Sequence, residues 1–197
     1  MGALDATPLR DADAIGWWEA LDERARHEIE DAARSSLSGR DLLLPGGGLA
    51  GELAMMLEAR ANPSFVGIGS VAAQPGALRL YGTGDGQRAV VVEEVERVGL
   101  HSFSTCRPAE AAGLFAGWAT TLPAGEAVGP SRGLELVHPD EHAPEHAMLV
   151  VRPIGEGRLV AGEATFSTPG SPVELRPASR DDVLARAEAL LCRFARV

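Results

Sequence analysis

Lysine is absent from this 197-residue chain, so all 18 of its basic residues are arginines. The arginines are scattered singly, and 28 acidic residues outnumber them, which gives a formal net charge of −10. A nucleic-acid-binding protein needs clustered basic side chains that displace counterions from phosphates. The charge pattern therefore excludes nucleic acid as the expected partner.

Long hydrophobic runs and cysteines are also scarce. No apolar stretch approaches the roughly 20 residues that cross a bilayer, and the first residues have neither the basic nor the apolar segment of a secretory signal. Two cysteines, Cys106 and Cys192, are too few for a disulfide framework, and we expect both to be small buried apolar groups. These absences predict a cytoplasmic protein with no membrane partner.

The remaining composition is that of a globular protein, with 45% hydrophobic and 23% charged residues. The length allows a single domain over residues 1–197 with a sizeable core. The abundance of alanine and glycine, together with arginine as the sole basic residue, is typical of a GC-rich genome such as that of an actinobacterium.

Hydrophobic periodicity predicts the secondary structure. Helices are expected over residues 12–37, 49–60, 108–122 and from 179 onward, and strands over 65–71, 77–83, 88–96, 100–105, 148–152, 158–166 and 173–176. Residues 123–147 are the least regular part. Short turns such as Asp85-Gly86 link consecutive strands, which must then run antiparallel.

The two strand regions resemble each other. Arg107-Pro108-Ala109 follows the first, and Arg176-Pro177-Ala178 follows the second at an offset of 69 residues (176 − 107). We therefore expect pseudo-repeat halves at about 40–123 and 124–197, preceded by the helix at 12–37. The predicted class is α+β: an antiparallel sheet built from two related strand-meander-plus-helix halves, with helices packed on the sheet.

A glycine-rich loop, Gly46 to Gly51, matches the G-x-G-x-x-G pattern of dinucleotide-binding sites ahead of a helix. The apolar segment before it is only three residues long, and no acidic residue follows about 20 residues on to hold a ribose. A strand meander follows in place of a βαβ unit. We therefore expect a flexible entrance to a helix and no bound cofactor.

Three histidines, His138, His142 and His146, recur at steps of four among acidic residues. Imidazole and carboxylate are good zinc ligands, and the spacing matches a zinc-peptidase pattern. Pro139 and Pro144 interrupt the helix that this chemistry needs. A solvated acidic loop is the expected structure, and a small enzyme or metal-binding protein using these histidines is the alternative.

The sequence shows no other arrangement of residues that would predict catalysis. No G-x-S-x-G nucleophile motif is present, and strand alternation places His101 and Cys106 on opposite faces. The adjacent carboxylates Glu93 and Glu94 also point to opposite sides. No catalytic residue is predicted, and we expect the protein not to be an enzyme.

Two adjacent tryptophans, Trp17 and Trp18, lie about 100° apart on the predicted first helix. Trp18 belongs to the apolar stripe, so core packing is expected for it. Trp17 lies at the edge of the stripe and could be part of a docking surface, since aromatic side chains dominate protein interfaces. A self-associating structural protein is therefore a further alternative.

The order of elements resembles the EspG family of type VII (ESX) secretion-associated proteins of actinobacteria. The resemblance rests on the entrance Leu42 to Gly48, the helix closing at Asn62-Pro63, the meander, the helix ending at Leu122-Pro123, and the closing segment Val173 to Asp182. The two related halves fit this family, whose fold surrounds a central antiparallel sheet.

The resemblance implies a cytosolic chaperone or adaptor without catalytic activity. Family members hold an exported helical substrate of the PE–PPE type and mask its hydrophobic tip. The candidate partner-binding residues here are Trp17, Thr83, Asp85, Gln87, Leu184 and Leu191. The expected partner is a helical secretion substrate or a second copy of the chain.

Overall fold

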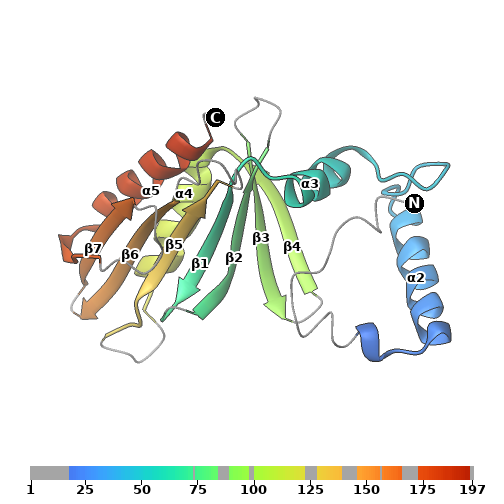
Figure 1. The fold of residues 1–197 in the computed structure, drawn as a ribbon, viewed down its shortest axis with the longest axis horizontal. Coiled ribbons are helices and arrows are strands. Elements are labelled where there is room, and N and C mark those ends of the chain that lie inside the picture. Colours follow the sequence, from blue (N-terminus) through green and yellow to red (C-terminus); the bar gives the residue numbers. More distant parts are fainter. Residues whose placement is uncertain are drawn as a thin grey trace.

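The computed structural model describes residues 18–72, 74–83, 89–97, 100–122, 128–138, 146–155, 157–165 and 173–195. In this part of the chain, eight strands form one antiparallel sheet with helices packed against it (Figure 1). The predicted α+β class is confirmed.

The strands follow the chain in two groups of four. The first group is β1 (Val66–Val71), β2 (Gln74–Gly82), β3 (Val90–Arg97) and β4 (Leu100–Cys106), and the second is β5 (Arg132–Val137), β6 (His146–Gly155), β7 (Arg158–Thr165) and β8 (Arg176–Ala178). Their order across the sheet is β4-β3-β2-β1-β5-β6-β7-β8. Each half is thus a meander, and the first strands of the two halves meet at the centre.

One helix follows each meander: α4 (Pro108–Thr120) after β4 and α5 (Arg180–Phe194) after β8. The two helices pack on each other and on the same face of the sheet. Alanines on α4 allow this close approach. The main core lies between the helices and the sheet, and its fully buried side chains include Phe65, Leu80, Leu134, Leu149, Phe115, Leu191 and Phe194.

The caps of the two helices differ although their preceding sequences match. Pro108 lies in the first turn of α4, where Arg107 and Glu110 form a capping box. Arg176-Pro177-Ala178 instead forms strand β8, and α5 begins two residues later. The helix expected from residue 179 onward is present, and Ser179 caps it, since the Ser179 hydroxyl accepts a hydrogen bond from the Asp182 amide at 3.1 Å.

A strand lies inside the segment that was expected to be irregular. Strand β5 directs Leu134 and Leu136 into the core while Glu135 points away. Its register pairs Ile68 of β1 with Glu135, so this strand connects the two halves. The alternation is present in the sequence, but it spans only six residues between segments rich in proline, glycine and acids.

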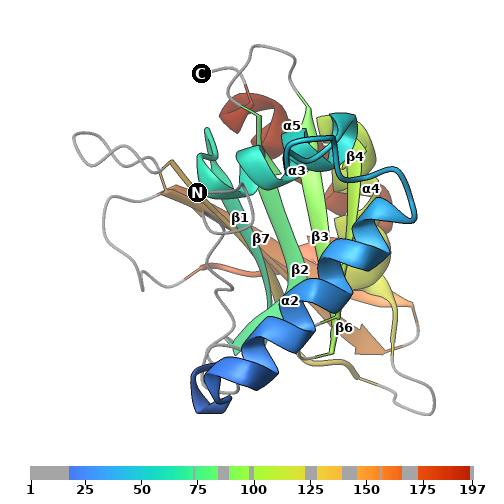
Figure 2. The same cartoon turned by 90° about the vertical axis from the view of Figure 1, so that its right-hand side faces the viewer.

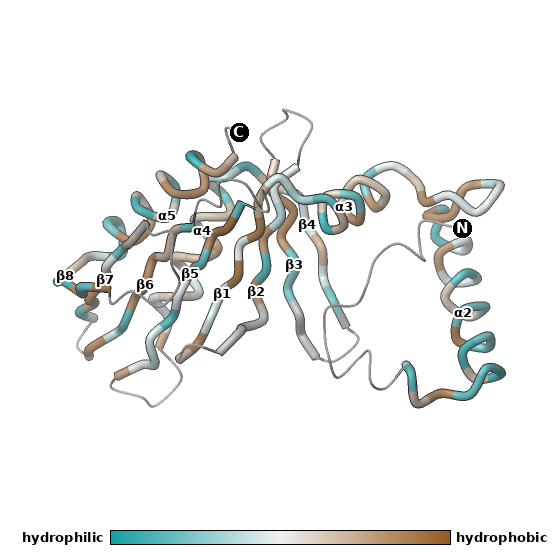
Figure 3. The backbone as a smooth tube through the Cα atoms, viewed as in Figure 1, coloured by the Kyte–Doolittle hydropathy of each residue, from teal (hydrophilic) through white to brown (hydrophobic). Residues whose placement is uncertain are grey.

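The long helix expected over residues 12–37 was wrong in extent and in packing. Helix α2 spans Glu23–Ser38 because Asp22 caps it, accepting a hydrogen bond from the Ala25 amide at 2.7 Å. No residue of α2 is buried, and Trp18 is half-buried outside both apolar clusters. In Figure 3 the helix stands to one side of the sheet and is largely hydrophilic, and Figure 2, turned by 90°, shows it in front of the strands.

The glycine loop forms a tight hairpin before α3 (Gly51–Ala61). Leu43 pairs with Leu49, and the Leu44 amide donates to the Gly48 carbonyl at 2.6 Å. Gly46 and Gly47 adopt φ values of +104° and +87°, which favour glycine. None of the helices in the described part of the chain is both long and apolar enough to span a membrane.

Candidate functional site

Helix α3 lies on the sheet face opposite to α4 and α5. Met56 and Ala59 of α3 pack on Tyr81 and Val91 in a second, smaller apolar cluster. The close strand neighbours of α3 are β2, β3 and β4, all from the first half. This face of the sheet is therefore covered by a helix on the first half.

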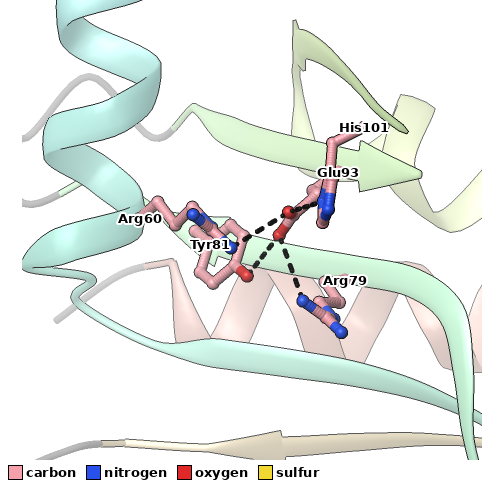
Figure 4. Close-up of polar contacts among 5 residues, drawn as sticks. All are labelled: Arg60, Arg79, Tyr81, Glu93 and His101. Atoms are coloured by element: carbon pink, nitrogen blue, oxygen red, sulfur yellow. Dashed lines mark hydrogen bonds and ion pairs between the residues drawn. The ribbon is translucent and has the colours of Figure 1, made fainter. Parts of the chain in front are cut away.

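A cluster of five polar side chains lies beside α3 and surrounds one carboxylate (Figure 4). We call it the Glu93 cluster; its members are Arg60, Arg79, Tyr81, Glu93 and His101. The Glu93 side chain is 0% exposed, and those of Arg60 and His101 are 5% and 8% exposed. Arg79 is the most accessible member, at 19%.

Each carboxylate oxygen of Glu93 has two partners. Oε1 lies 2.6 Å from His101 Nδ1 and 3.3 Å from Arg60 Nη2. Oε2 accepts a hydrogen bond from the Tyr81 hydroxyl at 2.5 Å and lies 3.9 Å from Arg79 Nη1. Since an ionised carboxylate is an acceptor only, His101 carries its proton on Nδ1. The cluster thus ties the last turn of α3 to three strands.

Tyr81 is kept protonated by its surroundings. Burial raises the pKa of Tyr81 above its ordinary value, and the hydrogen bond to Glu93 and its charge raise the pKa further. Arg60 opposes this rise. The phenol therefore remains a donor to the carboxylate.

Sequence reasoning recognised the opposite orientation of Glu93 and Glu94 but missed the cluster. Glu94 is exposed, whereas Glu93 is fully buried. The available signal was a charged residue directly after the apolar run Val90 to Val92, because a carboxylate there must be paired when the strand is buried. Its partners come from three other elements, and only cross-strand register brings them together.

His101 and Cys106 lie on opposite faces of β4, as alternation predicted. His101 contacts Glu93 on the α3 side, whereas Cys106 packs against the main core. Burial raises the pKa of the Cys106 thiol, and the charge of Glu110 raises it further. The thiol is thus held in its less nucleophilic protonated form.

The second half of the sheet presents a contrasting surface on the α3 side. We call it the open face; its apolar members are Ile68, Val137, Met148 and Val150, all half-buried. In the described part of the chain, no helix covers this face of β5 and β6 (Figure 1).

The strand register allows the side chains of the two halves to be compared position by position along one row of the sheet. Next to Ile68 in the first half come Arg79 and then Glu93. Next to Glu135 in the second half come Met148 and then Ala164. In this row, the buried carboxylate of Glu93 and its partner Arg79 lie on the half that α3 covers, whereas the positions beyond Glu135 on the uncovered half are apolar.

Gly133 and Gly162 flank Val150 in one row of the open face. A Cβ at Gly162 would lie 2.2 Å from the Glu174 carbonyl oxygen and 2.8 Å from a Val173 methyl. The chain following residue 172 therefore passes directly over β7, and it marks one border of the open face.

Two of the three histidines in the alternative metal-binding interpretation are described, and they lie on opposite faces of the sheet. His138 stacks on Phe194 of α5 at 4.7 Å, and its Nδ1 lies 2.8 Å from the Ser64 carbonyl. His146 Nε2 lies 2.6 Å from Glu135 on the open face. His142 lies outside the described residues, among which no three His, Cys, Asp or Glu side chains could hold a metal ion.

The predicted partner-binding residues are not gathered at one place. Trp17, Asp85 and Gln87 lie outside the described residues. Thr83 closes the β2 end with a hydroxyl that donates to the Ala89 carbonyl at 3.2 Å. Leu184 packs half-buried on the main core, and Leu191 is fully enclosed in it. The apolar open face was missed, because its members come from three strands whose order only the fold provides.

Comparison of the chain with protein-family models, curated proteins and solved structures finds no match.

Proposed function

We propose that this chain is a non-catalytic binding protein that takes a helical protein partner on the open face. The observation that carries the proposal is the contrast between the two halves of one sheet face. Half-buried apolar side chains lie on β1, β5 and β6, where the described chain supplies no helix to cover them. Contiguous apolar surface that no other element covers is typical of interaction sites.

Helix α3 supports a helix as the occupant. It covers the first half with a short apolar side made by Met56 and Ala59. A sheet face is stably covered by helices or by a second sheet, and this protein uses a helix on the equivalent surface. A partner helix would bury Ile68, Met148 and Val150 in the same way.

Glu135 adds a polar feature to this surface. Its side chain is 34% exposed and lies between Ile68 and Met148 in the strand register. With a net charge of −10, the protein favours a partner whose apolar side includes a cationic or neutral polar residue opposite Glu135. Charge matching of this kind selects among partners more than it adds affinity.

The resemblance to the EspG family supplies the finer proposal. On this account the protein is a cytoplasmic chaperone or adaptor that holds an exported helical protein of a type VII secretion system. The partner would be a PE–PPE-type helical pair. A second copy of the chain is the competing occupant of the same surface.

The test measures binding of a PE–PPE-type helical pair by isothermal titration calorimetry. Met148→Glu introduces a charge into the open face, so it should weaken binding more than tenfold, about 1.4 kcal/mol or more. Leu114→Glu is the matched control, because Leu114 is 45% exposed on α4, on the other side of the sheet.

The control should bind as the wild type does. Equal affinities for Met148→Glu and wild type would overturn the assignment of the surface. Failure of the wild type to bind any such helical pair would overturn the secretion-chaperone proposal.

A further inference from the structure

The Glu93 cluster contains more positive than negative charge. Arg60 and Arg79 each carry a guanidinium, which is a cation in proteins. In the described part of the chain, Glu93 is the one carboxylate within ion-pair distance of either arginine. Two cations therefore share a single buried anion, which leaves one positive charge without a partner in a poorly solvated place.

The same cluster is short of hydrogen-bond acceptors. Arg60 Nε and Arg79 Nη1 have almost no solvent contact and donate no hydrogen bond to an acceptor among the described residues, and Arg60 Nη2 has only its ion pair with Glu93 Oε1 at 3.3 Å. His101 Nε2, on the far side of the imidazole from Glu93, is likewise without a hydrogen-bond partner there. Buried polar atoms without partners are uncommon, and each calls for a physical explanation.

Arg79 is the guanidinium that Glu93 satisfies least. Its Nη1 lies 3.9 Å from the carboxylate, beyond hydrogen-bond distance, whereas the Tyr81 hydroxyl binds the same oxygen at 2.5 Å. Arg79 is also the cluster member most open to solvent. A ligand would therefore reach the cluster through Arg79.

We propose that the Glu93 cluster binds one small monovalent anion, of the size of chloride, against Arg79. Such an anion supplies both the missing negative charge and the missing acceptor. A water molecule would supply only an acceptor and would leave the surplus charge unchanged. Because Arg60 belongs to α3 and Arg79 to β2, the bound anion would strengthen the attachment of α3 to the sheet.

The experiment replaces sodium gluconate by sodium chloride at constant ionic strength and fixed pH while the unfolding temperature, Tm, is measured. Gluconate is a much larger anion than chloride and serves as the comparison ion. Above the dissociation constant, each tenfold rise in chloride should raise Tm by roughly 3–5 °C for a chain of this size. A ³⁵Cl NMR line broadened by the protein provides a second readout of binding.

Two variants make the result specific. Arg79→Met leaves Glu93 and Arg60 as a balanced pair, so its Tm should not depend on chloride and its ³⁵Cl line should narrow. Arg152→Met removes an exposed arginine from the same sheet face and should behave as the wild type does.

Several results would overturn the proposal. If the wild-type Tm does not change with chloride concentration and the ³⁵Cl line is not broadened, the cluster binds no chloride and water alone fills it. Equal loss of the effect in Arg152→Met would indicate general screening. Stabilisation by sulfate greater than that by chloride would indicate salt exclusion from the protein surface. The wild-type measurements decide the question even if Arg79→Met fails to fold.

Discussion

Ile68 of β1 pairs with Glu135 of β5, and from this pair the two halves of the sheet extend in opposite directions with different chemistry. On the first half the next positions in the row are Arg79 and Glu93, beside α3. On the second half they are Met148 and Ala164. A buried charge cluster and an open apolar surface thus belong to one face of one sheet.

Replacement of Glu93 tests the buried charge cluster. Glu93→Gln removes the one anion that the described part of the chain places beside Arg60 and Arg79, so both guanidinium groups lose their partner. The free energy of unfolding should fall by about 3–5 kcal/mol, as measured by urea denaturation. Glu94→Gln is the adjacent control, because Glu94 is exposed and lies on the opposite face of β3, and its effect should stay within about 0.5 kcal/mol. Similar effects of the two variants would contradict the structure.

Tyr81→Phe tests the hydrogen bond from the phenol to Glu93. Loss of a hydrogen bond to a charged group should cost about 1.5–3 kcal/mol near neutral pH. The folded-state pKa of Tyr81 is raised, so the phenol's contribution is fully present below the unfolded pKa of about 10. It is lost as the pH rises above that value, because the unfolded chain releases the proton first.

The pH dependence of Tm tests whether the folded protein raises the pKa of Tyr81, through burial first and the Glu93 carboxylate second. Between about pH 9 and 11, the wild type should lose stability more steeply than Tyr81→Phe, so that the two Tm curves converge. Parallel curves over this range would show that the pKa of the phenol is not raised in the folded protein.

Two glycine replacements should change stability in opposite directions. Gly162→Ala places a Cβ against the Glu174 carbonyl and should lower the free energy of unfolding by about 1–3 kcal/mol. Gly113→Ala lies within α4 with nothing within 4 Å of the new Cβ. It should raise the free energy of unfolding by about 0.4–1 kcal/mol. Stabilisation by Gly162→Ala would mean that residues 173 and 174 do not pass over β7.

The sequence predicted the architecture because both meanders have strong period-two alternation and short turns. Helix α5 was placed to within one residue because Ser179 is an unambiguous cap. Strand β5 was missed because its alternation is short and lies among residues typical of loops. The predicted first helix extended beyond the start of α2 because Asp22 is as polar as a solvent-facing helical residue. Its role as a cap depends on the local backbone geometry, which the sequence pattern does not show.

The two candidate sites depended on information that no local pattern contains. Glu93 finds its partners on α3, β2 and β4, and the open face combines β1, β5 and β6. Spacing along the sequence grouped His138 with His146. The pairing of β5 with β6 instead places their side chains on opposite faces of the sheet. Local alternation predicts which side a residue faces, whereas strand order decides what it meets there.

Methionine methyl NMR tests most directly whether the open face binds a helical partner. Met148 lies on the open face, whereas Met56 belongs to α3 and packs on the covered half of the sheet. A PE–PPE-type helical pair should shift the Met148 methyl resonance and leave that of Met56 unchanged. Dilution of the protein alone should leave both resonances in place. A shifted Met56 with an unchanged Met148 would contradict the account, and a Met148 resonance that moves on dilution would assign the surface to a second copy of the chain.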